Sequence, residues 1–144
     1  MNERSVLPML LMASCRSHSS ESVSPAQAEE LSSAEQIVRL QYDAYNRHDL
    51  DAFVAAHAPN VRAYSYPDSL LFEGRDSLRA GFGRLFSSAP QVHANIDSRM
   101  ALGNIVVSKE TATGLPGGKT NTGVFVWEVH NGQTTRIPQL VAAR

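Results

Sequence analysis

The chain has 144 residues, of which 42% are hydrophobic and 19% are charged, so it can bury one ordinary core, and nothing in it suggests a second domain. The formal net charge is −1, and Lys and Arg form no cluster, so the chain lacks the basic patch that a nucleic-acid partner would need. The single cysteine excludes an intramolecular disulfide.

Residues 1–14 have the layout of a lipoprotein-type signal peptide. Arg4 precedes a short apolar run at 6–12, and two small residues then lead to Cys15. This resemblance to bacterial lipoprotein signals implies cleavage before Cys15 and lipidation of its thiol, which would anchor the protein to a membrane on the periplasmic side. The alternative is an uncleaved tail with an incidental thiol, in a secreted or cytoplasmic protein. Residues 15–31 are rich in Ser and poor in large apolar side chains, which predicts a flexible linker.

A first helix is predicted to begin at Ser32 or Ser33. These serines are followed three residues later by Glu35 and Gln36, which is the capping-box pattern. The helix should run to about His48, with apolar residues recurring at helical spacing. These apolar positions are Ile37, Val38, Leu40, Ala44 and Tyr45.

Two further helices are predicted before the sheet. Asp49 can cap a short second helix, which Pro59 ends. Gly74 and Asp76 introduce a third helix. Its buried stripe is predicted to consist of Leu78, Phe82, Leu85 and Phe86.

The remaining apolar runs predict strands bounded by turn residues. Their ranges are 61–66, about 70–72, 93–102, 105–113, 120–130 and 134–141. Gly103-Asn104 and Asn131-Gly132 are hairpin signals, and a longer loop runs through Leu115–Gly118. Pro138 has no backbone N–H, which predicts that the last strand lies at a sheet edge. The fold class is therefore α+β, with three N-terminal helices packed on a curved antiparallel sheet in a domain covering residues 32–144.

Alternation along the strands predicts one apolar and one polar face. A two-residue turn at Gly103-Asn104 would place Asp97 opposite Glu110, and the same face would continue to Glu128. The opposite face would hold Ile96, Met100, Leu102, Ile105, Val107, Thr111, Phe125, Trp127 and Val129. Because the apolar face should lie against the helices, we expect the three carboxylates on the convex face, as a cross-strand charge ladder or a polar dimer seam.

Four motifs in this order resemble the SnoaL-like branch of the NTF2-like superfamily. They are Tyr-Asn-x-His-Asp-Leu-Asp-x-Phe at 45–53, Gly-Arg-Asp-x-Leu-Arg at 74–79, Thr-Gly-x-Pro-Gly-Gly at 113–118 and Val-Trp-Glu-Val-His-Asn-Gly at 126–132. The resemblance implies a cone-shaped NTF2-like or cystatin-like fold, which commonly forms homodimers through its sheet. It also suggests the activities known in this branch, namely polyketide cyclisation and steroid delta-isomerisation.

The ketosteroid isomerases of this superfamily use a helix tyrosine, a strand aspartic acid and a carboxylate base before a proline. The resemblance places Gln41 or Tyr42 at the tyrosine position and Ser65 or Tyr66 at the base position. An apolar residue within 124–126 occupies the aspartic acid position, so this triad is not matched. SnoaL-type cyclases instead use one acidic general acid/base. The candidates here are Asp97, Glu110 and Glu128.

Aromatic side chains are predicted to converge inside the cone and to bind a small, largely apolar molecule. These candidates are Tyr42, Tyr45, Tyr64, Tyr66, Phe82, Phe86 and Trp127. No pair of histidines has zinc-ligand spacing, so neither a metal nor a cofactor is expected.

Three functions therefore stay open. The first is ligand binding without a clear catalytic set. The second is an enzyme that transfers a proton on a cyclic substrate, with Glu110 or Asp97 as the acid/base and Tyr42 or Tyr45 orienting it. The third is a homodimeric interaction module whose pocket is simply filled.

Overall fold

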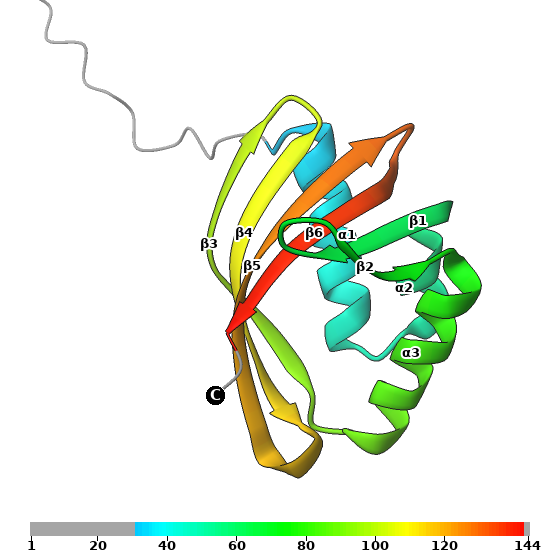
Figure 1. Cartoon of the computed structure of the whole chain (residues 1–144), viewed down its shortest axis with the longest axis vertical. Helices are drawn as coiled ribbons and strands as arrows, with labels where there is room; N and C mark the ends of the chain where they lie inside the picture. Colours follow the sequence, from blue (N-terminus) through cyan, green and yellow to red (C-terminus); the bar gives the residue numbers. More distant parts are fainter. Residues whose placement is uncertain (1–30, 143–144) are drawn as a thin grey trace, which may run out of the picture.

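In the computed structural model, which describes residues 31–142, two helices come first, and two strands, the third helix and four further strands follow (Figure 1). The helices are α1 (Ser33–Asn46), α2 (Leu50–Ala55) and α3 (Arg75–Ser88). The strands are β1 (His57–Ser65), β2 (Ser69–Glu73), β3 (His93–Leu102), β4 (Ile105–Leu115), β5 (Lys119–His130) and β6 (Gln133–Ala142), with a short 3-10 turn, η1 (Pro116–Gly118), before β5. The predicted α+β fold is confirmed. The predicted signal peptide, Cys15 and the linker up to residue 30 lie outside the described residues.

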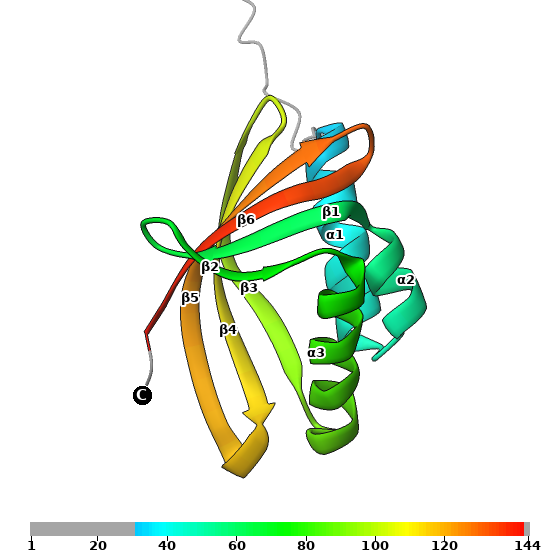
Figure 2. The ribbon, with the colours of Figure 1, turned by 45° about the vertical axis from the view of Figure 1, so that its right-hand side comes forward.

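The six strands form one sheet in the order β2-β1-β6-β5-β4-β3. All neighbouring strands are antiparallel except β1 and β6, which run parallel. The sheet curves strongly, and all three helices lie on its concave side (Figure 2). The space between α1, α3 and the curved strands is where the candidate site forms.

The prediction that Pro138 places its strand at a sheet edge was wrong. β6 lies inside the sheet between β1 and β5, and Pro138 stands opposite Tyr64 of β1. On the other side, the register pairs Phe125 with Gln139 and Glu128 with Arg136, leaving a gap at the proline. The sheet therefore accommodates the missing N–H by interrupting one ladder locally.

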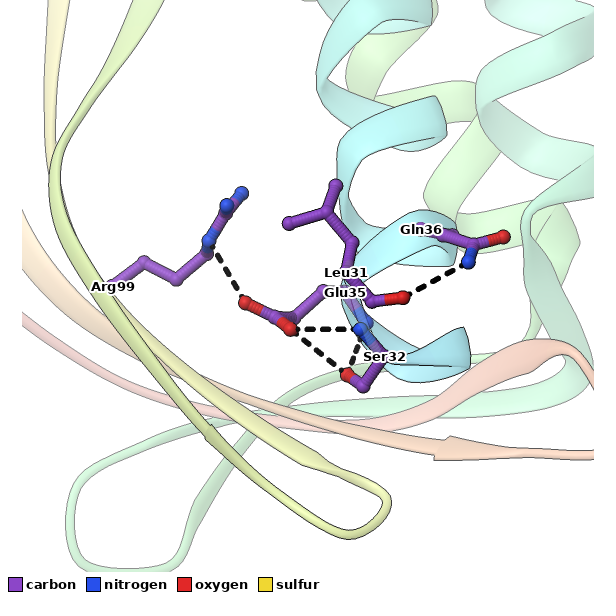
Figure 3. Close-up of polar contacts among 5 residues, drawn as sticks. All are labelled: Leu31, Ser32, Glu35, Gln36 and Arg99. Carbon is purple, nitrogen blue, oxygen red and sulfur yellow. Dashed lines mark hydrogen bonds and ion pairs between the residues drawn. The ribbon is translucent and has the colours of Figure 1, made fainter. Parts of the chain in front are cut away.

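The N-terminus of α1 carries the predicted capping box (Figure 3). The Glu35 backbone N–H donates to Ser32 Oγ at 3.3 Å, and the Ser32 N–H donates to Glu35 Oε2 at 3.0 Å. Arg99 of β3 completes the arrangement, because its Nε lies 3.1 Å from Glu35 Oε1. One acidic side chain thus caps the helix and also ties the helix to the sheet.

β1 begins at His57, four residues before the predicted start, and His57 is completely buried at the junction with α2. Its Nδ1 donates to the Phe53 carbonyl at 2.8 Å, whereas Nε2 has no partner among the described residues. Burial lowers the pKa of His57 to about 4. The side chain is therefore a neutral core residue at physiological pH.

The core fills the space between the helices and the concave face of the sheet. Val38, Leu78 and Val106 are almost completely buried there. The other members of this cluster include Ala34, Tyr42, Ala44, Phe53, Val54, Val61, Ala63, Ala94, Trp127, Val129 and Ile137. Helices and sheet are thus held together by one continuous apolar cluster.

The predicted face of Glu110 was wrong: it lies on the concave, helix-facing side and is buried. β3 holds an extra residue at Asp97, because Ile96 pairs with Glu110 and Ser98 pairs with Lys109. This β-bulge takes Asp97 out of the predicted pair. Glu110 therefore shares the face of Ile96, which packs against the core.

The apolar face was also misassigned at the β3–β4 hairpin. The turn pairs Leu102 with Ile105 as predicted, but Met100 and Leu102 are 70% and 86% exposed. The cause is the number of residues in the connection from β4 to β5 through η1, which places Ser108 opposite Phe125. Phe125, Trp127 and Val129 do lie on the concave side as predicted, and this pairing brings the even-numbered residues of β4 onto the same side.

Candidate functional site

A cavity of about 320 Å³ lies between α1, α3 and the concave face of the sheet. That volume is within the range of small-molecule pockets. The lining residues are Gln41, Tyr42, Tyr45, Phe53, Phe82, Leu85, Ala94, Glu110, Ala112, Leu115, Asn121, Gly123, Phe125, Trp127, Gln139 and Val141. Most of them are apolar or aromatic. Glu110 is the one acidic residue among these lining residues, which include no Lys, Arg or His.

Four of the seven aromatic residues predicted for the pocket line this cavity. They are Tyr42, Tyr45, Phe82 and Trp127. Their rings contact one another: Tyr42 meets Trp127 edge-on with centroids 5.8 Å apart, and Tyr45 meets Phe82 in the same way at 6.0 Å. The pocket wall therefore contains two aromatic pairs, one between α1 and β5 and one between α1 and α3.

The other three predicted aromatics do not line the cavity. Phe86 lies behind the wall, where it packs against Tyr45 and stacks on His48 with centroids 4.9 Å apart. Tyr64 lies beneath the Arg136 guanidinium, which is 4.8 Å from its ring centre. Tyr66 is 69% exposed near the β1–β2 turn. These positions correct the prediction for all three residues.

Phe53 and Phe125 line the cavity but were absent from the predicted set. Phe53 lies on α2, where its ring centre is 4.6 Å from that of Phe82. Phe125 stacks on Trp127 at 5.7 Å, with the two planes nearly parallel. The alternation of apolar residues along β5 had already predicted Phe125 on the helix-facing side, so the sequence did contain the pattern that would have added Phe125 to the predicted pocket.

A chain of buried polar groups leads from the aromatic wall to Glu110. Trp127 Nε1–H donates to Ser108 Oγ at 2.8 Å, and Ser108 O–H donates to Glu110 Oε1 at 2.5 Å. The Tyr42 hydroxyl lies 3.5 Å from the same Ser108 oxygen. Ser108 is completely buried, and Glu110 is 7% exposed. The carboxyl group of Glu110 is therefore held by the hydrogen bond from Ser108, in a residue that lines the cavity.

The surroundings of Glu110 change its acidity. Burial among apolar side chains raises the pKa of Glu110 to about 8, although the nearby Trp127 N–H acts in the opposite direction. No cationic side chain lines the cavity to offset the desolvation. At neutral pH the group is mainly a neutral carboxylic acid, which can donate a hydrogen bond or a proton. Burial also raises the pKa of Tyr45 to about 12.

Gln41 is a second polar residue in the wall, and it is 1% exposed. Its Oε1 accepts a hydrogen bond from the Thr134 hydroxyl at 3.0 Å. Its Nε2 has no hydrogen-bond partner among residues 31–142. An amide donor without a partner in an apolar wall is costly, and a ligand oxygen could relieve that cost.

Asp97 does not join this site. It is exposed on the outer face, where it accepts a hydrogen bond from the Thr111 hydroxyl at 2.7 Å. Glu128 lies outside the cavity as well, paired with Arg136 at 2.8 Å. Of the acid candidates, only Glu110 therefore reaches the cavity. Within the described range, no group of three or more His, Cys, Asp or Glu could hold a metal ion.

A curved sheet that wraps with three helices around an apolar cavity is the NTF2-like, or cystatin-like, fold. Within that class, the chain belongs to the SnoaL-like domain family, whose model matches residues 38–137. The resemblance found in the sequence motifs is thus confirmed. No curated protein matches the chain.

Solved structures share the fold at low sequence identity. An uncharacterized cystatin-fold protein from Novosphingobium aromaticivorans has 24% identity and a TM-score of 0.68, over 76% of this chain and 98% of that one. A candidate SnoaL-like polyketide cyclase from Shewanella denitrificans has 18% identity and a TM-score of 0.65, over 76% and 90%. A candidate ketosteroid isomerase from Kribbella flavida has 17% identity and a TM-score of 0.65, over 78% and 79%. At these identities the similarity concerns the fold alone.

Proposed function

We propose that this SnoaL-like domain binds a small, largely apolar molecule in its cone. The observation that carries the proposal is the cavity of about 320 Å³, whose wall is mainly aromatic and aliphatic. Such a wall favours apolar surface through the hydrophobic effect and ring contacts. The few polar groups, Glu110 and Gln41 among them, would orient the ligand.

The chain provides its own reporter for this proposal. Trp127 is the single tryptophan, and it lines the cavity, so its fluorescence should change when a ligand enters. Native mass spectrometry of the purified protein should also reveal a small molecule retained from the host. Ala112→Leu should fill part of the cavity and weaken binding, whereas Ala80→Leu on the exposed surface of α3 is the matched control. Equal binding by both variants would place the ligand elsewhere.

Proton transfer is the second candidate function, and the position of Glu110 favours it. The carboxyl lies in the cavity, it is buried, and its pKa of about 8 suits a group that gives and takes protons near neutral pH. A bound ketone would then exchange its α-hydrogens with solvent faster than the free ketone does. NMR of the ketone in deuterated buffer measures this rate, and Glu110→Gln should abolish the enhancement. An unchanged rate in that variant removes Glu110 from the chemistry.

We also propose that the mature protein is lipid-anchored through Cys15 on the periplasmic side of a membrane. The support is the signal-like segment at 1–14 and the Ser-rich linker after it. Between residues 31 and 142, each helix is too short or too polar to cross a bilayer. Cys15→Ser should move the protein from the membrane fraction to the soluble fraction. A variant that stays with the membrane would exclude the lipid as the anchor.

The proposed partner is a second copy of the chain, docked through the outer face of the sheet. This face exposes large apolar side chains on neighbouring strands: Met100, Leu102, Ile105, Val124 and Leu140. Val124 stands opposite Leu140, so the apolar surface continues across the β5–β6 pair. Sedimentation velocity should show a dimer that Val124→Glu dissociates. Leu71→Glu on β2 is the control, and a monomeric wild type would refute the proposal.

A further inference from the structure

The end of the sheet that carries the β3–β4 turn exposes apolar side chains. Leu102 is 86% exposed, more than the other large apolar residues of the described chain, and Met100 is 70% exposed. Leu102 pairs with Ile105 across the turn, and Met100 lies two residues away on the same face of β3. These three residues form the hairpin tip. Neighbouring apolar side chains that are exposed at a turn indicate a surface with a partner.

The described chain begins beside this hairpin tip. Two grooves lie between the first turn of α1 and the β3–β4 turn. Leu31, the first described residue, lines one of these grooves together with Met100. The ion pair between Arg99 and Glu35, at 3.1 Å, ties this end of α1 to β3 (Figure 3). The segment that leads back to Cys15 therefore joins the domain at the hairpin tip.

The length of that segment limits how far the hairpin tip can lie from a membrane. Residues 16–30 separate Cys15 from the domain. A Ser-rich chain of this length has a root-mean-square span of about 20 to 25 Å, and its fully extended reach is about 60 Å. A lipid on Cys15 would therefore hold the hairpin tip close to the bilayer surface. Because the tethered domain is then present at a high effective concentration, a weak second contact is enough to dock it.

The charges at this end of the domain do not oppose contact with a membrane. Three described segments meet here, and they are 31–37, 99–105 and 128–133. Their acidic residues are Glu35 and Glu128, and each carboxylate is paired with an arginine, Arg99 and Arg136 respectively. On these segments an anionic lipid surface would thus meet no unpaired carboxylate.

We propose that the hairpin tip inserts into the interface of the membrane that carries the lipid anchor, so that the domain gains a second contact with the bilayer. This inference rests on the proposed lipid anchor at Cys15. Apolar side chains at a membrane surface insert about 5 to 10 Å deep, at the boundary between headgroups and acyl chains. Figure 1 and Figure 2 show the connection between β4 and β5 at the opposite end of the sheet. Docking would therefore give the domain a fixed orientation, with that end pointing away from the membrane.

The hairpin tip lies at the margin of the outer face that a second copy of the chain is proposed to cover. Next to Ile105 across the sheet stands Glu128 of β5, which is paired with Arg136, so the apolar side chains end there in that direction. Val124 and Leu140 face each other further along β5 and β6. The membrane and the second copy are therefore assigned different central residues, which variants can separate.

A fluorescent label at position 102 tests the docking in the lipidated protein. Cys15 is the single cysteine, so once it carries the lipid, Leu102→Cys introduces the one free thiol of the chain. The protein is placed in vesicles of phosphatidylethanolamine and phosphatidylglycerol, with and without spin-labelled acyl chains that quench a nearby NBD dye. We expect the dye at position 102 to be quenched. Lys119→Cys is the matched control, because this exposed position lies beside η1 at the other end of the sheet, and its dye should stay unquenched.

A substitution beside the label separates the contribution of the hairpin tip from that of the dye. Met100→Glu in the labelled protein should lower the ratio of docked to free domain about 10-fold, because a carboxylate replaces an apolar side chain at the interface. Leu71→Glu replaces an exposed apolar residue on β2 and should leave the quenching unchanged. Quenching that survives Met100→Glu would mean that the dye alone enters the membrane, which overturns the inference.

The other outcomes distinguish the docking from the anchor and from the second copy. No quenching at position 102 would mean that the domain stays clear of the bilayer, which overturns the inference and leaves the anchor intact. Equal quenching at positions 102 and 119 would mean that the domain has no fixed orientation and overturns it as well. A dye at position 102 that is shielded from water without lipid quenching, and becomes exposed in Val124→Glu, would assign the hairpin tip to the second copy. An intact mass without a lipid on Cys15 refutes the anchor, and the inference fails with it.

Discussion

Replacing Glu110 by Gln should change how the stability of the protein depends on pH. In the folded state, burial keeps Glu110 protonated up to a pKa of about 8, whereas its ordinary pKa is 4.5. The folded protein therefore binds more protons than the unfolded chain between these values, and the free energy of unfolding falls as the pH rises. Gln keeps the shape and the acceptor oxygen for Ser108 but removes the titration.

The effect of Glu110 on the free energy of unfolding is best measured between pH 6.5 and 8. His57 has the opposite effect below pH 6.5, because its pKa falls from 6.5 to about 4 on folding and stability rises with pH between those values. Above pH 6.5 that contribution levels off, and it is the same in the wild type and in Glu110→Gln, so it cancels when the two are compared. The 1.5 pH units of this range correspond to about 2 kcal/mol. From pH 6.5 to pH 8, the free energy of unfolding of Glu110→Gln should therefore rise by that amount relative to that of the wild type.

Urea unfolding at pH 6.5, 7, 7.5 and 8 measures the difference directly. Asp97→Asn is the control, because this exposed carboxyl lies outside the cavity and its removal should shift all four values alike. A stability difference between Glu110→Gln and the wild type that stays constant from pH 6.5 to 8 would refute the buried, neutral state of Glu110. Unequal m-values would show instead that the denatured state had changed.

Three further predictions concern the frame of the fold, each measured by urea unfolding. Gly114→Ala should destabilise far more than Gly103→Ala: both glycines have positive φ, but only at Gly114 would the new methyl collide with the Gln91 carbonyl. Equal losses would show that the backbone at Gly114 moves freely. Leu78→Ala should cost about 2 to 5 kcal/mol, since the side chain is completely buried, and a loss below 1 kcal/mol would mean that the core collapses around it. Ser32→Ala should lower the free energy of unfolding by about 1 kcal/mol, because α1 loses its cap; an unchanged value would mean that the capping box in Figure 3 does not stabilise the fold.

Local sequence signals predicted most of the elements. The capping box at Ser32 marked the start of α1, and Gly103-Asn104 and Asn131-Gly132 marked two hairpin turns that the structure contains. These features depend on residues within a few positions of one another, so a single sequence contains the information. The aromatic character of the cavity could be predicted for the same reason, because Tyr45 belongs to the helical stripe and Trp127 to an alternating strand.

The faces of Glu110 and Asp97 could not be predicted, because each depends on how neighbouring strands pair. The connection through η1 sets whether odd or even residues of β4 face the helices, and so decides the side of Glu110. The bulge at Asp97 shifts β3 by one residue and separates Asp97 from that side. The raised pKa of Glu110 follows from its burial, so it could not be predicted without knowing the strand register.

The parallel pairing of β1 with β6 has a consequence for folding kinetics. Arg62 pairs with Arg136 and Ala63 with Ile137, so these contacts close a loop that contains α3 and four strands of the sheet. Local hairpins such as β3–β4 can form early, whereas this long-range pairing must wait for a large loss of chain entropy. Because β6 is the sole link between β1–β2 and β3–β5 in the described sheet, its docking joins two separate halves. We expect slow, cooperative folding, with the β1–β6 seam formed last.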